Sequence, residues 1–212
     1  MDAALGFKPR TGRAVMVLLV RDAQGARVLE RAEVPLLPPG AFAPYHEAEE
    51  MEPRAAHRHV TQRIAAARRM ARDVVRGVMR RCQAQGLKLR GCGVQVGSPV
   101  PRWSTAEVLA VHIRMHKVEG EMFRGILVEA AQACGLRVTT LPSKAPLDAA
   151  ARLLRLPSAR LDAQLLALRK SAGPPWGGHE KEAAAAALAV LARSRRSSSP
   201  ASDLRTRVRH SQ

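Results

Sequence analysis

Two short motifs of histidine and glutamate hold the residue types that could do chemistry, and each stands directly ahead of an apolar helical pattern. The first, residues 116–121 (His-Lys-Val-Glu-Gly-Glu), opens the apolar run 122–134. The second, residues 179–182 (His-Glu-Lys-Glu), opens the alanine-rich run 183–192. Carboxylates can bind a divalent metal, and imidazoles can transfer protons. Glutamate in a first helical turn also complements the helix dipole without any chemistry, so both interpretations stay open.

The first motif has a third potential metal ligand close by. His112, His116 and Glu119 are spaced by four and three residues, so they share a face if one helix carries them all. Two imidazoles and a carboxylate on one face could coordinate a divalent metal. Histidines four residues apart also occur by chance, and the glutamate that follows the first histidine of a zinc-protease helix is absent here. Glu119 is the main member, because Gly120 beside it permits close approach of a backbone or a substrate.

The chain is strongly basic. Its 212 residues include 35 Lys and Arg against 18 Asp and Glu, a formal net charge of +17. Such an excess favours a polyanionic partner such as nucleic acid, because neutralised phosphates release their counterions. Abundant arginine and alanine also fit a GC-rich bacterial genome, in which part of the charge serves no partner. Both explanations stay open at this point.

One predicted helix, residues 53–85, carries nine Arg and one Asp. Its apolar positions recur every three or four residues, as expected for a helix packed on a core. The opposite face carries four arginines at the same spacing: Arg69, Arg72, Arg76 and Arg80. Like charges so placed repel mildly without a partner, so we interpret this ridge as a nucleic-acid contact, with a solvated face as the alternative. Lys8 and Arg10, in a basic segment expected to precede the first strand, are further candidate nucleic-acid contacts.

The apolar patterns predict an α/β chain. An unbroken apolar run at 14–20 and an alternating run at 27–34 indicate a hairpin, and residues 89–96 and 137–141 read as further strands. A capping box at Ser104 starts a helix that ends near residue 115 or continues to residue 133. The other expected helices cover 53–85, 145–156, 158–170 and 179–192. Between the last two, Trp176 either fills a core position or offers a stacking surface for a base.

The ends of the chain and its cysteines bear on the compartment. Residues 193–212 are rich in Ser and Arg and lack apolar periodicity, so we expect a disordered basic tail. No signal pattern and no membrane-spanning run is present, which predicts a cytoplasmic protein with no membrane partner. Three cysteines without a Cys-x-x-Cys pair favour reduced thiols.

The order of these elements resembles the ribonuclease-H-like superfamily, especially the RuvC family of Holliday-junction resolvases. Residues 120–141 resemble a helix and strand of that fold, and residues 179–190 look like its closing acidic, alanine-rich helix. The chain is also similar to a bacterial group with a Thr-Gly start and a His-x-x-Glu-Gly motif, a similarity that implies no activity. The resemblance implies a mixed sheet with flanking helices over residues 1–192, with residues 143–172 as a helical insertion.

The resemblance further implies where acidic residues would bind Mg²⁺. Family nucleases place one acid in the first strand, one in the strand matching 89–96, and one in the final helix. With 14–20 taken as the first strand, that strand has no acid, Gln95 stands in the second position, and Glu182 or Glu180 matches the third. We therefore expect the two-metal site to be missing in its usual form.

Three functions follow as alternatives. The first is a metal-dependent nuclease with a relocated site, in which Glu119 and Glu182 hold Mg²⁺ or Mn²⁺ and a histidine acts as general acid or base. The catalytic residues would be Glu119, Glu182, His116, His179 and His46. The second is a related module that binds DNA or RNA without cutting it. The third is an inactive scaffold or partner-binding protein. A homodimer is left open in each.

Overall fold

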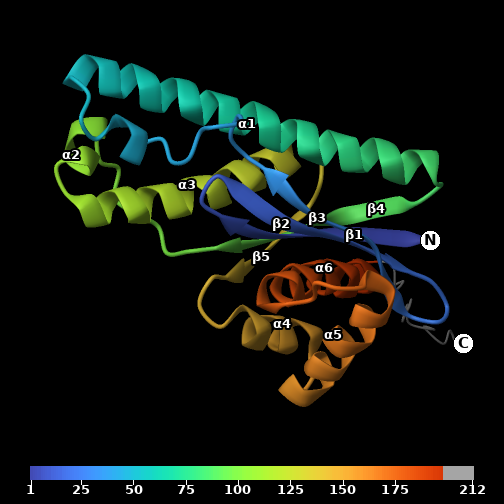
Figure 1. Ribbon diagram of the computed structural model, residues 1–212. Helices are drawn as coiled ribbons and strands as arrows, with labels where there is room; N and C mark the ends of the chain where they lie inside the picture. Colours follow the sequence, from blue (N-terminus) through green and yellow to red (C-terminus); the bar gives the residue numbers. More distant parts are fainter. Residues whose placement is uncertain (198–212) are drawn as a thin grey trace, which may run out of the picture.

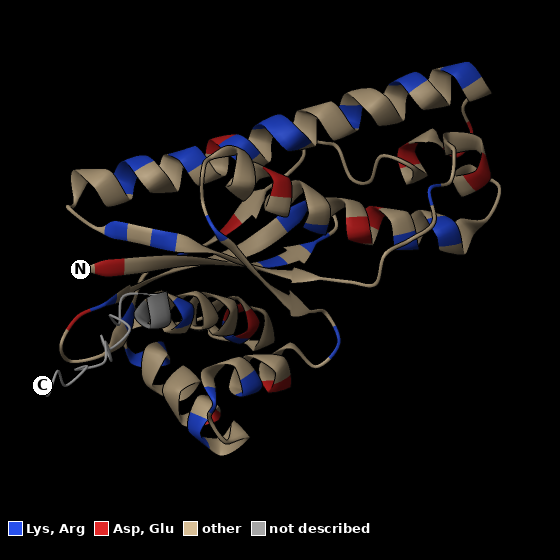
Figure 2. Ribbon diagram, turned by 180° about the vertical axis from the view of Figure 1, so that it is seen from behind, with Lys and Arg blue, Asp and Glu red and all other residues tan. Residues whose placement is uncertain are grey.

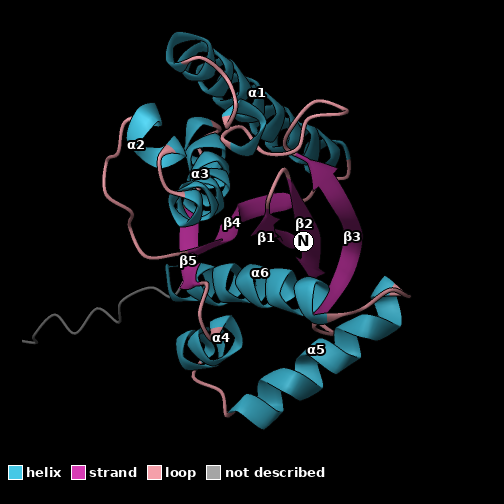
Figure 3. Ribbon diagram, turned by 60° about the vertical axis from the view of Figure 1, so that its left-hand side comes forward, coloured by secondary structure: helices cyan, strands magenta, loops and turns pink. Residues whose placement is uncertain are grey.

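The computed structural model describes residues 1–197, with side chains up to residue 194, and is built around one mixed five-stranded sheet. The strands are β1 (Asp2–Arg10), β2 (Arg13–Arg21), β3 (Ala26–Pro35), β4 (Lys88–Val96) and β5 (Val138–Pro142). Their order across the sheet is β3-β2-β1-β4-β5. The pairs β1–β2 and β2–β3 are antiparallel, whereas β4 and β5 run parallel to β1 (Figure 3).

The expectation that the chain begins with a basic loop is wrong, because Lys8 and Arg10 lie in β1, the central strand of the sheet. β1 contains alanine, glycine and proline and therefore has little intrinsic preference for strand structure. Pairing on both sides overrides that preference. Pro9 is tolerated because the pairing of β1 with β4 ends at Phe7 and Val94, so Pro9 removes no hydrogen bond from that ladder.

The predicted hairpin is confirmed as β2 and β3, the second and third strands of the sheet. β2 is buried on both faces, as its unbroken apolar run indicated. β1, which precedes the hairpin, is a fifth strand that the apolar patterns did not predict.

Helices cover both faces of the sheet (Figure 1). They are η1 (His46–Ala48), α1 (Pro53–Ala84), α2 (Thr105–Leu109), α3 (His112–Ala133), α4 (Pro146–Leu154), α5 (Ser158–Ala172) and α6 (Gly178–Ser197). α1 and α3 pack together over one face, while α6 lies directly against the other. α4 packs on α6, and α5 packs on the edge strand β3. This mixed sheet with helices on both faces is the expected architecture.

The helix after the capping box is interrupted once. Ser104 accepts a hydrogen bond from the backbone of Glu107, and Glu107 reaches back to Ser104, as the capping box predicted. α2 then stops, Val111 takes an extended conformation, and α3 continues to Ala133. α6 likewise extends to Ser197, beyond the expected end near residue 192. The predicted disordered tail lies mostly outside the described residues, and the treatment of 143–172 as an insertion stays a prediction.

α6 approaches the sheet closely because small residues meet there. A Cβ atom on Gly6 of β1 would lie 2.0 Å from the carbonyl oxygen of Ala183, and one on Gly93 of β4 would lie 2.3 Å from that of Ala186. Such separations are sterically forbidden, so these two positions require glycine. The buried alanines of α6 complete this contact between helix and sheet. It fixes the first turn of α6 above the ends of β1 and β4.

The three cysteines are free thiols, as expected, and burial raises the pKa of Cys92 and of Cys82. Trp176 packs against the core beneath α5 and α6, and its indole N–H donates to the carbonyl of Leu165 at 3.1 Å. The core interpretation of this tryptophan is therefore confirmed. None of the helices within residues 1–197 is long and apolar enough to cross a membrane.

Candidate functional site

Three polar side chains meet where β1, β4 and α6 converge, and we call Lys8, Gln95 and Glu182 the sheet-edge cluster. The Lys8 ammonium lies 2.6 Å from Oε2 of Glu182 and donates to Oε1 of Gln95 at 3.0 Å. The Gln95 amide donates to Oε2 of Glu182 at 3.0 Å, and Gln95 is only 1% exposed. Each member of the cluster thus has a partner within it.

The sheet-edge cluster does not fit a pair of divalent cations. The first strand, β4 and the final helix do converge, as the family resemblance implied for its acidic residues. They bring one ammonium, one amide and one carboxylate. Two-metal chemistry needs several carboxylates around two cations about 4 Å apart. Here the ammonium of Lys8 already neutralises the single carboxylate.

A second cluster lies at the start of α3. It consists of His46 from η1 and of His112 and His116 from the first turns of α3. One ring nitrogen of each lies within 4.8 Å of the other two. The Nε2 atoms of His112 and His116 are 3.1 Å apart. The ring centroid of His46 lies 4.6 Å from that of His116 and 5.3 Å from that of His112. We call these three residues the histidine cluster.

Glu119 lies one turn beyond His116 and is buried, with 2% of it exposed. Its Oε1 accepts hydrogen bonds from the backbone N–H groups of Tyr45 at 2.8 Å and His46 at 3.3 Å. Its Oε2 lies 2.8 Å from Nδ1 of His46. A buried carboxylate is stable only when its oxygens are satisfied, and these three contacts do that. Burial and the charge of Glu119 raise the pKa of Tyr45, so the phenol stays protonated.

A small separate core supports the histidine cluster. Its buried members come from the segment before η1, from η1 itself, and from α1, α2 and α3: Tyr45, Ala48, Ala56, Val60, Val108 and Met115. Tyr45 and Met115 are direct sequence neighbours of His46 and His116. Packing of these neighbours therefore fixes the backbone on both sides of the cluster.

Glu47 ties the segment that carries His46 to α1. Its carboxylate accepts hydrogen bonds from the backbone N–H of Phe42 and from Nε of Arg63, and it contacts Nε2 of His59 at 2.8 Å. Burial raises the pKa of Glu47. The hydrogen bonds from Phe42 and His59 and the charge of Arg63 outweigh that effect and hold the pKa below its ordinary value.

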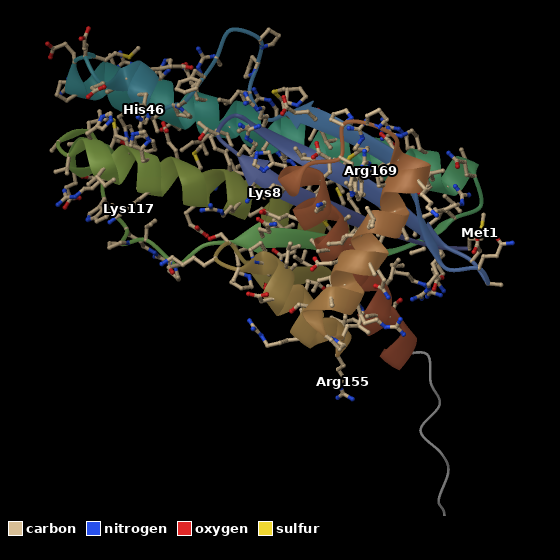
Figure 4. The ribbon with its side chains drawn as sticks, turned by 60° about the horizontal axis from the view of Figure 1, so that its bottom comes forward. Met1, Lys8, His46, Lys117, Arg155 and Arg169 are labelled. Atoms are coloured by element: carbon tan, nitrogen blue, oxygen red, sulfur yellow. The ribbon has the colours of Figure 1, made fainter. Side chains whose placement is uncertain are left out.

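The two clusters are separate, and the helices that carry Glu119 and Glu182 lie on opposite faces of the sheet (Figure 1). Glu119 is in α3, and Glu182 is in α6. They share no hydrogen-bonding partner among the contacts of the described residues. Gly97, which follows β4, donates its N–H to Glu121 of α3 at 3.1 Å, so the end of β4 connects the two layers. Figure 4 shows Lys8 and His46 at different places in the fold.

Among the described residues, the remaining predicted site residues form no hydrogen bond or ion pair with either cluster. His179 is exposed in the first turn of α6. Glu180 accepts the backbone N–H of Gly177 at 2.8 Å, the structural role that acidic residues take at helix starts. Arg10 lies 3.8 Å from Glu33 of β3. The structure thus brings together His46, His116 and Glu119 from the predicted set, and separately Lys8 and Glu182.

The predicted arginine ridge is exposed along α1. Arg69, Arg72, Arg76 and Arg80 are all exposed, and none of them forms an ion pair with another described residue. The adjacent Arg68 forms an ion pair with Glu129, and the adjacent Arg81 forms one with Glu30. Figure 2 shows basic residues recurring along α1.

Three members of these clusters, Lys8, Gln95 and His112, were not in the predicted set of catalytic and metal-binding residues. Lys8 was expected only to contact an anion, because β1 was not recognised as a strand. His112 was noted at helical spacing from His116, which was the available signal. His46, the third member of the histidine cluster, stands 66 positions before His112 in the sequence. Only the tertiary structure shows that the two residues are close.

Comparison with known proteins supports the fold. The sequence matches no model of a known protein family and no curated protein. Among solved structures, the chain is similar to Thermus thermophilus RuvC in complex with a Holliday-junction substrate. The identity is 14%, the TM-score 0.51, and the match covers 94% of this chain and 98% of that one. A second RuvC structure from the same organism matches at 13% identity and a TM-score of 0.49, over 92% and 96% of the two chains.

The chain therefore has a ribonuclease-H-like fold of the RuvC-like type. The likeness extends over nearly the whole of both chains. At this identity it establishes the fold and leaves activity to the site residues.

Proposed function

We propose that this protein binds nucleic acid through its RuvC-like domain, with the exposed arginines of α1 contacting phosphates and without two-metal cleavage at the sheet edge. The observation that carries the proposal is the ridge of Arg69, Arg72, Arg76 and Arg80, exposed and without an ion pair among the described residues. The similar RuvC structure is a complex with a Holliday-junction substrate, which supports a nucleic acid as the partner.

The dimensions of the ridge suit a phosphate backbone. Eleven helical steps from Arg69 to Arg80 span about 16 Å along α1. That length corresponds to the axial rise of roughly five base pairs of duplex DNA. Four guanidinium groups over this span can each reach a phosphate, and guanidinium binds phosphate oxygens in a paired geometry.

The sheet-edge cluster supports binding without cutting. Lys8 and Gln95 satisfy Glu182, so this edge holds one neutralised carboxylate where cation pairs need several. The Lys8 side chain is also 18% exposed, so a phosphate oxygen could approach it. Binding therefore requires no metal at this place.

The test is equilibrium binding to branched, duplex and single-stranded DNA and to RNA, measured by fluorescence anisotropy at low salt. A variant with Arg69, Arg72 and Arg76 changed to Gln should bind at least tenfold more weakly. The matched control changes Arg152, Arg160 and Arg169 to Gln, which removes the same charge from exposed sites on α4 and α5. Equal weakening in both variants would assign binding to net charge. No binding by the wild type would leave a scaffold or partner-binding protein.

A second candidate function is metal-dependent phosphodiester hydrolysis at the histidine cluster. The observation favouring it is that His46, His116 and Glu119, expected as catalytic residues, do lie together. Incubation of the same substrates with Mg²⁺, Mn²⁺ or Zn²⁺ tests it, comparing the wild type with Glu119→Gln and His116→Gln. Cleavage by the wild type that both variants lose would support hydrolysis, and cleavage that they retain would contradict it.

A further inference from the structure

We propose that His46, His112 and His116 form a binding site for one first-row transition-metal ion of the Zn²⁺ type, with Glu119 as the residue that positions His46. The site does not depend on the proposed nucleic-acid binding, and metal binding can be measured without any nucleic acid.

The spacing of the three rings suits a single ion. A metal about 2.0–2.1 Å from each nitrogen in a tetrahedral arrangement places those nitrogens about 3.3 Å apart. The Nε2 atoms of His112 and His116 are 3.1 Å apart. One ring nitrogen from each of the three histidines lies within 4.8 Å of the other two. Small rotations of the exposed rings of His112 and His116 would close the remaining gap.

Glu119 determines which nitrogen of His46 is available. As a carboxylate it accepts the Nδ1–H of His46 at 2.8 Å, which leaves the lone pair on Nε2. That Nε2 atom is buried and has no hydrogen-bond partner among the described residues. A histidine that ligates a metal usually gives its other ring N–H to a carboxylate or carbonyl in this way. An unpartnered buried nitrogen beside two other imidazoles is therefore explained by a metal.

A second carboxylate lies near the cluster. Oε1 of Glu49 lies 3.7 Å from Nδ1 of His112, the ring nitrogen that does not face His116, which is longer than a hydrogen bond. His112 and His116 are exposed, so an ion has a path from solvent.

The ligand type favours a particular class of metal. Imidazole suits zinc, copper, nickel and iron, whereas Mg²⁺ prefers oxygen ligands and near-octahedral geometry. Both oxygens of Glu119 already accept hydrogen bonds from Tyr45 and His46, so Glu119 positions a ligand here and does not itself bind the ion. Three protein ligands leave one tetrahedral position for water or a substrate oxygen, as in catalytic zinc sites.

The test is Zn²⁺ titration of the metal-free full chain by calorimetry, with Co²⁺ as a spectroscopic probe. We expect one ion per chain, and visible Co²⁺ absorption of tetrahedral type. Glu119→Gln should weaken Zn²⁺ binding about 10- to 100-fold, the usual effect of removing such a carboxylate. His116→Asn should weaken it further, because it removes a ligand. Mg²⁺ should not compete.

Controls separate the site from other histidines and from misfolding. His179→Asn changes an exposed histidine outside the cluster and should leave Zn²⁺ binding unchanged. His116 is also exposed, so His116→Asn should keep the thermal unfolding midpoint of the metal-free wild type. Wild-type affinity in His116→Asn, or an equal loss in His179→Asn, would overturn the site. If the chain failed to bind nucleic acid in the separate anisotropy experiment, the proposed metal site would not be contradicted.

Discussion

The ammonium nitrogen of Lys8 lies 2.6 Å from Oε2 of Glu182, which joins the first strand of the sheet to the last helix. Gln95 of β4 bridges the same two residues. An ammonium, an amide and a carboxylate thus satisfy one another where β1, β4 and α6 converge.

Replacing Lys8 with Met should destabilise the protein by about 1–3 kcal/mol, because it leaves a largely buried carboxylate and amide without their cation. The free energy of unfolding, measured by denaturant titration, checks this prediction. The double variant Lys8→Met with Glu182→Gln should recover part of the loss, since the unpaired charge is then gone. An unchanged stability in Lys8→Met would show that the ion pair contributes nothing.

Gly93→Ala should destabilise the protein strongly, by about 1–3 kcal/mol or more, because the new methyl group would overlap the backbone of α6 at Ala186. Its matched control is Gly125→Ala within α3, where an added Cβ meets nothing within 4 Å. That control should be neutral or stabilising by roughly 0.5–1 kcal/mol, because alanine favours a helix. The thermal unfolding midpoints of the two variants test this prediction. Equal midpoints would contradict the close contact of α6 with the sheet.

Glu47→Gln should make the stability less dependent on acidic pH. The pKa of Glu47 is lowered in the folded protein, so its stabilising effect is complete above its unfolded pKa of about 4.3 and is lost as the pH falls through the folded value. The difference in unfolding midpoint between wild type and variant should therefore be constant between about pH 6 and 8 and shrink towards pH 3. A difference that grows with acidity would have the wrong sign.

The sequence predicted those elements whose apolar pattern is local. The stripe of α1, the run of β2 and the capping box at Ser104 each follow from neighbouring residues, and all three are confirmed. β1 was missed because its alanines and Gly6 carry no strand preference, and only pairing with β2 and β4 specifies it.

The site was predictable only in part for the same reason. The sequence left open whether one helix carries His112, His116 and Glu119, and α3 carries all three. The contact of Glu119 with His46 joins residues 73 positions apart, and no local pattern encodes it. Glu119 and Glu182 both begin helical patterns, yet α3 and α6 lie on opposite faces of the sheet.

The salt dependence of nucleic-acid binding tests the central claim most directly. A plot of the logarithm of the association constant for duplex DNA against that of the salt concentration has a slope of about −0.9 per phosphate contact. Changing Arg69, Arg72 and Arg76 to Gln should make the slope shallower by about 2.7 if each contacts one phosphate. The control variant at Arg152, Arg160 and Arg169 should keep the wild-type slope. An unchanged slope in the ridge variant, or an equal change in the control, would contradict the assignment of α1 as the nucleic-acid contact.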